Sequence, residues 1–137
     1  MPGIEALIQA EEDGTISFGN YTLNEKSKLQ DFEHQGDTYK VKTFYEITKL
    51  ERNGMFVYES VPGTAVRHFQ ETDQGVSCEI EGYKDSQVTV QLEEDVPYKV
   101  YEDGVLTAEI QTNLSGKLAV NLELEDGKPL LLKVVKA

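Results

Sequence analysis

Four polar residues that are each followed by glycine divide this chain into short segments: Asp13-Gly14, Asn53-Gly54, Asp103-Gly104 and Asp126-Gly127. Each pair lies between two runs in which apolar and polar residues alternate. A two-residue type I′ turn needs positive φ at both central positions, which Asn, Asp and Gly adopt most readily. The pairs therefore predict antiparallel hairpins and an all-β chain.

The second half of the chain is the more regular one. From Val66 onward, turn signals separate seven short alternating runs, the spacing typical of a small Ig-like β-sandwich. These strand candidates are Val66–Thr72, Gly75–Glu81, Gln87–Glu93, Tyr98–Tyr101, Val105–Gln111, Lys117–Leu124 and Leu130–Val135. Val61-Pro62-Gly63 interrupts the pattern before them, because proline cannot donate to a strand ladder. We therefore expect a hairpin-rich subdomain over residues 1–64, packed against an Ig-like β-sandwich subdomain over residues 65–137.

The first half predicts hairpins of uneven length. Residues 4–18 favour a hairpin over a helical turn, and Thr38–Glu51 is rich enough in β-formers to predict one long strand. A two-residue turn at Asn53-Gly54 would then pair Arg52 with Met55. The same register would pair Leu50 with Val57 and Lys49 with Tyr58.

The charge of the chain is strongly negative and evenly spread. Its 25 acidic and 13 basic residues give a net charge of −12, and neither half is basic. Nucleic-acid binding needs a basic face, so no nucleic-acid partner is expected. The negative field is also expected to repel polyanions and anionic membranes.

No motif for metal, cofactor or nucleophilic chemistry is present. Cys78 is the single cysteine and shares a strand face with Val76 and Ile80, so it is expected to be buried. His34 and His68 lack metal-ligand spacing. Without a basic leader or a run of about 20 apolar residues, a cytoplasmic protein with no membrane association is expected. We therefore predict no catalytic residues, no metal site and no cofactor.

Acidic residues are concentrated at the turns, as in Glu11-Glu12-Asp13 and Glu93-Glu94-Asp95. Asp before Gly has a conformational reason to be there. Two acids across a cleft, about 5–10 Å apart, could also hydrolyse a glycosidic bond. Two acidic turns could also bind calcium. All three interpretations are open at this point.

Aromatic side chains form the best candidate for a binding surface. Tyr39, Phe44, Tyr45, Phe56 and Tyr58 are concentrated between residues 39 and 58. Exposed rings of this kind stack on sugars or contact a protein partner. The alternative is that they fill the core of a chain that has no Trp.

Three segments resemble a family of small acidic bacterial proteins of about this length that are often labelled endosialidase: Glu11–Tyr21, Asp31–Thr43 and Ile47–Val66. The resemblance covers nearly the whole chain and implies a bacterial β-protein connected with carbohydrate. The chain has two arginines, Arg52 and Arg67, so the arginine triad of sialidases has no counterpart in it. Residues 98–122 are also similar to sandwich modules appended to carbohydrate-active enzymes.

The expected function is therefore a non-catalytic β-sandwich module for binding or assembly, associated with carbohydrate or with a second copy of itself. The alternative is a carbohydrate-directed hydrolase or lyase that uses paired carboxylates, as the label of the resembled family implies.

Overall fold

The computed structural model describes residues 3–137, which form thirteen β-strands and no α-helix. The strands are β1 (Ile8–Ala10), β2 (Ile16–Phe18), β3 (Ser27–His34), β4 (Asp37–Phe44), β5 (Ile47–Arg52), β6 (Met55–Val61), β7 (Ala65–Thr72), β8 (Gly75–Glu81), β9 (Ser86–Gln91), β10 (Pro97–Glu102), β11 (Val105–Gln111), β12 (Lys117–Leu122) and β13 (Leu130–Lys136). The predicted all-β class is confirmed. Within residues 3–137, no helix is long and apolar enough to cross a membrane.

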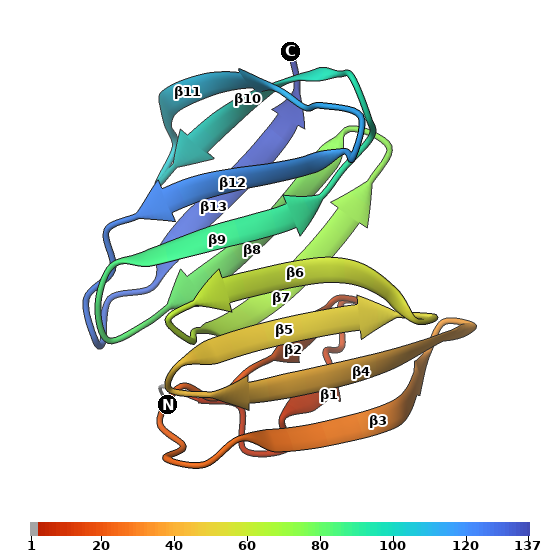
Figure 1. Cartoon of the computed structure of the whole chain (residues 1–137), viewed down its shortest axis with the longest axis vertical. Helices are drawn as coiled ribbons and strands as arrows, with labels where there is room; N and C mark the ends of the chain where they lie inside the picture. Colours follow the sequence, from red (N-terminus) through yellow and green to blue (C-terminus); the bar gives the residue numbers. More distant parts are fainter. Residues whose placement is uncertain (1–2) are drawn as a thin grey trace.

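Two antiparallel sheets pack face to face as a β-sandwich (Figure 1). One has the strand order β1-β2-β7-β8-β13-β10-β11, and the other has the order β12-β9-β6-β5-β4-β3. The boundary predicted at residues 64 and 65 falls between β6 and β7, where the chain passes from one sheet to the other. Each sheet contains strands from both sides of that boundary. The last seven strands divide five to two between the sheets, so the two sheets, rather than two halves of the chain, organise the fold.

Two of the four glycine turns have the predicted type I′ geometry, whereas at Asp13-Gly14 and Asp126-Gly127 only the glycine has positive φ. Asn53 and Gly54 have φ of 53° and 78°, and Arg52 pairs directly with Met55. Asp103 and Gly104 have φ of 51° and 84° between β10 and β11. Both are two-residue turns with positive φ at each central position, as type I′ geometry requires. The predicted N-terminal hairpin is confirmed as well, because β1 pairs with β2.

The long strand predicted over Thr38–Glu51 is wrong, because the chain reverses at Tyr45-Glu46. Phe44 at the end of β4 pairs with Ile47 at the start of β5. Tyr-Glu is not a recognised turn dipeptide, so no local signal marks this reversal. Hydrogen bonds from distant segments hold it instead, as the site below shows.

The register predicted for the β5–β6 hairpin is correct only at its turn. A β-bulge lies beyond Arg52 and Met55, so Leu50 pairs with Tyr58 and Lys49 pairs with Glu59. The predicted pairs of Leu50 with Val57 and Lys49 with Tyr58 are therefore wrong. An extra residue in one strand changes which face the next side chain occupies. This bulge allows the consecutive residues Val57 and Tyr58 both to be buried.

One hydrophobic core fills the space between the sheets. Its members include Phe18 from β2, Leu50 from β5, Ile80 from β8 and Leu132 from β13, all fully buried. Cys78 is buried among them, as predicted, and burial raises the pKa of its thiol to about 12. It packs as a small apolar side chain and is far from the thiolate form that nucleophilic chemistry needs.

Candidate functional site

The five aromatic residues predicted as a binding surface lie on different faces of the six-stranded sheet. Tyr39 is 7% exposed and Tyr58 is fully buried, and both belong to the core. Alternation places Phe44 on the opposite face, and Tyr45 at the turn is 42% exposed. Phe56 lies apart from this pair, where the Lys117 ammonium is 4.6 Å from its ring centroid. The expected aromatic surface is therefore corrected to Phe44 and Tyr45, while Tyr39 and Tyr58 fill the core.

A groove of about 610 Å³ adjoins Phe44 and Tyr45, and we call it the aromatic groove. Four segments of the chain form it: the residues just before β3, the end of β4 with the β4–β5 turn, the end of β6 and the loop after β8. The lining residues are Lys26, Lys42, Phe44, Tyr45, Glu46, Ile47, Val61, Pro62, Tyr83 and Lys84. Val61, one of the lining residues, is 51% exposed.

The main chain of Tyr45 holds these segments together. Its N–H donates to the carbonyl oxygen of Leu23 at 3.0 Å. Its own carbonyl oxygen accepts from the Gly63 N–H at 3.0 Å and from the Tyr83 hydroxyl at 2.8 Å. The turn at residue 45 is thus stabilised by tertiary hydrogen bonds rather than by its own sequence.

Gly63 is required at this corner because the neighbouring backbone approaches too closely for a side chain. A Cβ atom at position 63 would lie 2.1 Å from the carbonyl oxygen of Phe44, so the β4–β5 turn would have to move. This contact explains the glycine that follows Val61-Pro62 and fixes the distance between the turn and the end of β6.

The rings of the groove are held in defined orientations. Phe44 and Tyr45 pack edge to face with their centroids 5.3 Å apart, an arrangement that aromatic pairs prefer. Tyr83 stacks on Tyr21 at 5.9 Å, and the hydroxyl of Tyr21 donates to Asp126 at 2.7 Å. Desolvation raises the pKa of Tyr83, so its hydroxyl remains protonated and donates to the Tyr45 carbonyl.

A chain of fully buried hydroxyl groups supports the groove from within the sandwich. Thr64 connects it: its hydroxyl lies 2.8 Å from both the Tyr58 and the Ser60 hydroxyls, and its carbonyl oxygen accepts from Thr48 at 2.8 Å. Thr48 in turn lies 2.8 Å from Thr43 on β4. Buried polar groups that are fully bonded fix one arrangement of the segments that carry them.

Positive charge surrounds the groove. The Lys26 ammonium lies 5.8 Å from the ring centroid of Phe44, and that of Lys84 lies 5.6 Å from the centroid of Tyr83. Lys42 lines the groove from β4. These contacts are within the range of cation–π attraction, so the rings and the cations form one surface.

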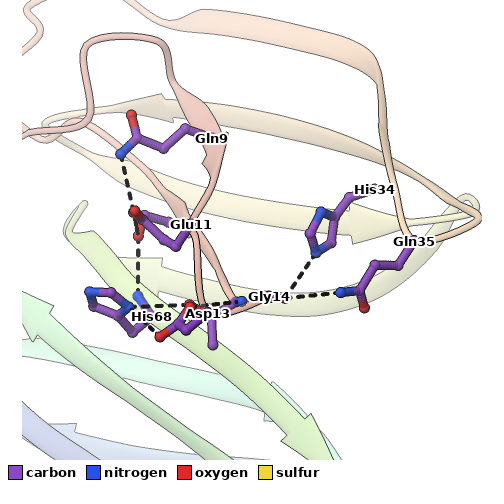
Figure 2. A network of polar contacts seen from close by, with 9 residues as sticks. Gln9, Glu11, Asp13, Gly14, His34, Gln35 and His68 are labelled. Carbon is purple, nitrogen blue, oxygen red and sulfur yellow. Dashed lines mark hydrogen bonds and ion pairs between the residues drawn. The ribbon is translucent and has the colours of Figure 1, made fainter.

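The two histidines lie in a second polar region, around the β1–β2 turn (Figure 2). His34 Nε2 and the Gln35 amide both contact the carbonyl oxygen of Gly14, at 3.0 and 3.4 Å. From the other side, His68 Nδ1 lies 3.1 Å from Asp13 Oδ2. A carbonyl can only accept, so His34 donates to Gly14.

The same region holds a pair of carboxylates. Glu11 accepts from Ser17 and Gln9, and Asp13 accepts from the side chain and backbone of Thr15. These hydrogen bonds lower the pKa of both acids. We call Glu11, Asp13, Ser17, His34 and His68 the histidine cluster.

A cleft of about 340 Å³ is lined in part by Asp13 and His34 of this cluster and in part by polar side chains that pair with one another. Arg52 pairs with Glu71, and Asp37 accepts from Asn53 at 2.9 Å. General acid catalysis needs a carboxyl with a raised pKa, whereas Glu11 and Asp13 are shifted in the opposite direction. Within residues 3–137, no three His, Cys, Asp and Glu side chains are grouped in a way that could hold a metal ion.

No family model, curated protein or solved structure gave a significant match to this chain. The site is therefore interpreted from its own geometry. Sequence patterns indicated Phe44 and Tyr45 but did not show that Lys26, Pro62 and Tyr83, which lie in other segments, join them in one groove. No local signal joins them.

Proposed function

We propose that this protein is a non-catalytic binding module whose ligand is a carbohydrate and whose binding site is the aromatic groove. The observation that carries the proposal is the set of exposed, oriented rings at one corner of the sandwich, with lysines beside them. The likeness of residues 98–122 to modules of carbohydrate-active enzymes supports the same function.

The chemistry of the groove suits a sugar. Tyrosine rings supply a rigid apolar surface at low entropic cost, against which the C–H face of a pyranose packs. The ammonium groups of Lys26, Lys42 and Lys84 can donate hydrogen bonds to a sugar, and the carboxylate of Glu46 can accept hydrogen bonds from it. Sugar hydroxyls therefore have both donors and acceptors available around the rings.

The hydrolase or lyase alternative has less support. It requires two carboxylates across a cleft, one of them with a raised pKa. Glu46 is the carboxylate that lines the aromatic groove. The carboxylates of the histidine cluster are stabilised in their charged form, which suits a general acid poorly.

A glycan array followed by calorimetric titration of the best ligand tests the proposal. Tyr45→Ala is the informative variant, because it removes the exposed ring and keeps the main-chain hydrogen bonds. Loss of one stacked ring is expected to weaken binding by about tenfold. Phe56→Ala is the matched control, since this ring lies on the same sheet outside the groove. Equal losses in both variants, or no binding to any glycan, would refute the proposal.

Assembly is a second candidate, and a specific feature favours it. The edge strand β11 leaves one side unpaired, and Val105 and Leu106 on it are 63% and 48% exposed. Open apolar edges of this kind pair with other strands. Light scattering of the wild type and of Leu106→Lys would measure whether the protein associates with itself. A monomer in both cases rules assembly out, whereas a wild-type dimer that the substitution dissociates supports it.

A further inference from the structure

Lysines on three neighbouring strands come together on the outer face of the six-stranded sheet. Lys28 on β3 is the direct cross-strand partner of Lys42 on β4, and Lys42 is the direct partner of Lys49 on β5. Lys40 lies two residues before Lys42 on the same face. Together with Lys26, these residues form what we call the lysine patch, which contains five of the 13 basic residues of the chain.

The lysine patch is electrostatically unfavourable for the protein alone. Like charges directly opposite one another destabilise an antiparallel pair, and here two such pairs adjoin. Burial and the charges of all four other lysines lower the pKa of Lys42. Lys49 pairs with Glu51 at 3.5 Å, while Lys26, Lys28, Lys40 and Lys42 form no ion pair within residues 3–137.

The composition of the chain makes this arrangement more notable. A chain with a net charge of −12 has many carboxylates that could alternate with these lysines, as Glu59 does on β6 next to Lys49. Three lysines on adjacent strands instead leave a surface of local positive potential on an acidic protein. The even charge of the sequence therefore conceals a local cluster of cations on a chain whose net field is expected to repel polyanions.

The lysine patch is continuous with the aromatic groove. Lys42 lines both the groove and the depression between Lys28, Lys40 and Lys49, and Lys26 lies over the ring of Phe44. A ligand that rests on the rings can thus reach the row of ammonium groups without leaving the surface. Neighbouring strands of a sheet lie about 4.8 Å apart, and alternate residues of one strand lie about 7 Å apart, so the backbone positions of these lysines are close together.

We propose that the lysine patch binds the carboxylate groups of an acidic polysaccharide, one sugar of which occupies the aromatic groove. The proposal rests on the proposed function, because it uses the groove as the site for the sugar ring. It adds the chemical class of the ligand: a linear glycan with carboxylates on successive residues, such as a polyuronate.

A polysaccharide fits the lysine patch better than a nucleic acid does. The lysine patch is small, with five lysines and no arginine, on a chain whose net charge is −12. Glu51 and Glu59 also lie on the same face. A polymer of closely spaced phosphates would meet these acids and the negative field beyond them.

The test is a titration of the full chain with polygalacturonate, neutral dextran and an oligothymidylate, at low and high salt. The double variant Lys28→Gln/Lys49→Gln removes both outer members of the row. Lys128→Gln/Lys133→Gln changes the net charge equally on other surfaces and is the matched control. Loss of two surface ion contacts is expected to weaken polygalacturonate binding by about three- to tenfold, and the control should bind like the wild type.

The outcomes separate this inference from the proposed function. If neutral and acidic glycans bind with equal affinity, and this affinity depends on Tyr45 but not on the lysines, the inference is overturned and the proposed function stands. Polygalacturonate binding that depends on the lysines but not on Tyr45 would refute the groove as the sugar site. Equal weakening in both double variants, or preferred binding of oligothymidylate, would overturn the inference. Absence of glycan binding would end both proposals.

Discussion

The histidine cluster and the lysine patch are both polar, yet the charged groups of the first have partners of opposite kind, whereas those of the second face one another. In the histidine cluster, Glu11, Asp13 and His68 all have hydrogen-bonding partners. In the lysine patch, cations face cations across two strand pairs. The first region lowers the energy of the fold, and the second raises it.

This difference separates structural polar residues from candidate binding residues better than residue type does. The histidine cluster contains two histidines and two acids, the residue types most often associated with catalysis. Its bonds, however, join the β1–β2 turn to β7 and to the β3–β4 turn, as a structural connection would (Figure 2). The lysine patch contains a single residue type, and within residues 3–137 Lys49 is the one member with an ion-pair partner, Glu51.

The largest expected effect is a loss of stability in the histidine cluster. Ser17 is fully buried, donates to Glu11 and accepts from the His68 N–H. Ser17→Ala removes both hydrogen bonds and takes this acceptor from the His68 N–H, so it should lower the free energy of unfolding by about 1–3 kcal/mol. Urea denaturation measures this change in the free energy of unfolding. Ser27→Ala is the control, because Ser27 is more exposed, and it should lower the free energy of unfolding by less than about 0.5 kcal/mol. Similar values for both would show that the cluster is not structural.

Low pH should remove the stabilisation that the carboxylates of the histidine cluster provide. Hydrogen bonds lower the pKa values of Glu11 and Asp13 below their ordinary 4.5 and 3.8. Their stabilisation is therefore complete above those values and is lost as the pH falls through the lower, folded values. The melting temperature of the wild type should fall over this range more steeply than that of Asp13→Asn. Parallel curves would contradict this assignment.

In the lysine patch, removal of a charged side chain should increase the stability of the fold rather than decrease it. Lys42→Gln removes a repelled charge and should raise the free energy of unfolding by about 0.5 kcal/mol at neutral pH. Because the pKa of Lys42 is lowered, the wild type should gain stability as the pH rises toward 10.5, and the variant should lack that gain. Lys133→Gln is the control. A destabilised Lys42→Gln variant would show that this amine has a structural role.

The smallest expected effect concerns ligand protection. If an acidic glycan neutralises the lysine patch, then saturating polygalacturonate should raise the melting temperature of the wild type by a few degrees. The increase should be smaller for Lys28→Gln/Lys49→Gln, and the Ser17→Ala variant should keep it in full. An equal increase in all three proteins would place the ligand elsewhere.

The turns and the alternation could be read from the sequence because they depend on neighbouring residues. Asn53-Gly54 and Asp103-Gly104 have the positive φ values that their residue types favour. The reversal at Tyr45-Glu46 could not be read, since its hydrogen bonds come from Leu23, Gly63 and Tyr83. The bulge after Leu50 was hidden for a related reason: it serves the burial of Val57 and Tyr58, which is a property of the packed sheets.

The candidate site was predictable only in part for the same reason. Phe44 and Tyr45 stand out in one segment, but the lysine patch is drawn from β3, β4, β5 and the residues just before β3. Summed charge showed no basic region, because Asp31, Glu33 and Asp37 lie between these lysines in the sequence. Pairing of strands brings lysines from separate segments side by side, and that arrangement cannot be known without the register.

The buried thiol of Cys78 can report how often the two sheets of the sandwich separate. A disulfide reagent in solution can reach this atom only while the two sheets are apart, and the chain has no other sulfur that would react with it. The rate of modification in native buffer therefore measures how often the sandwich opens. Anything that closes the molecule more firmly, a bound glycan included, will slow the reaction without any label or substitution.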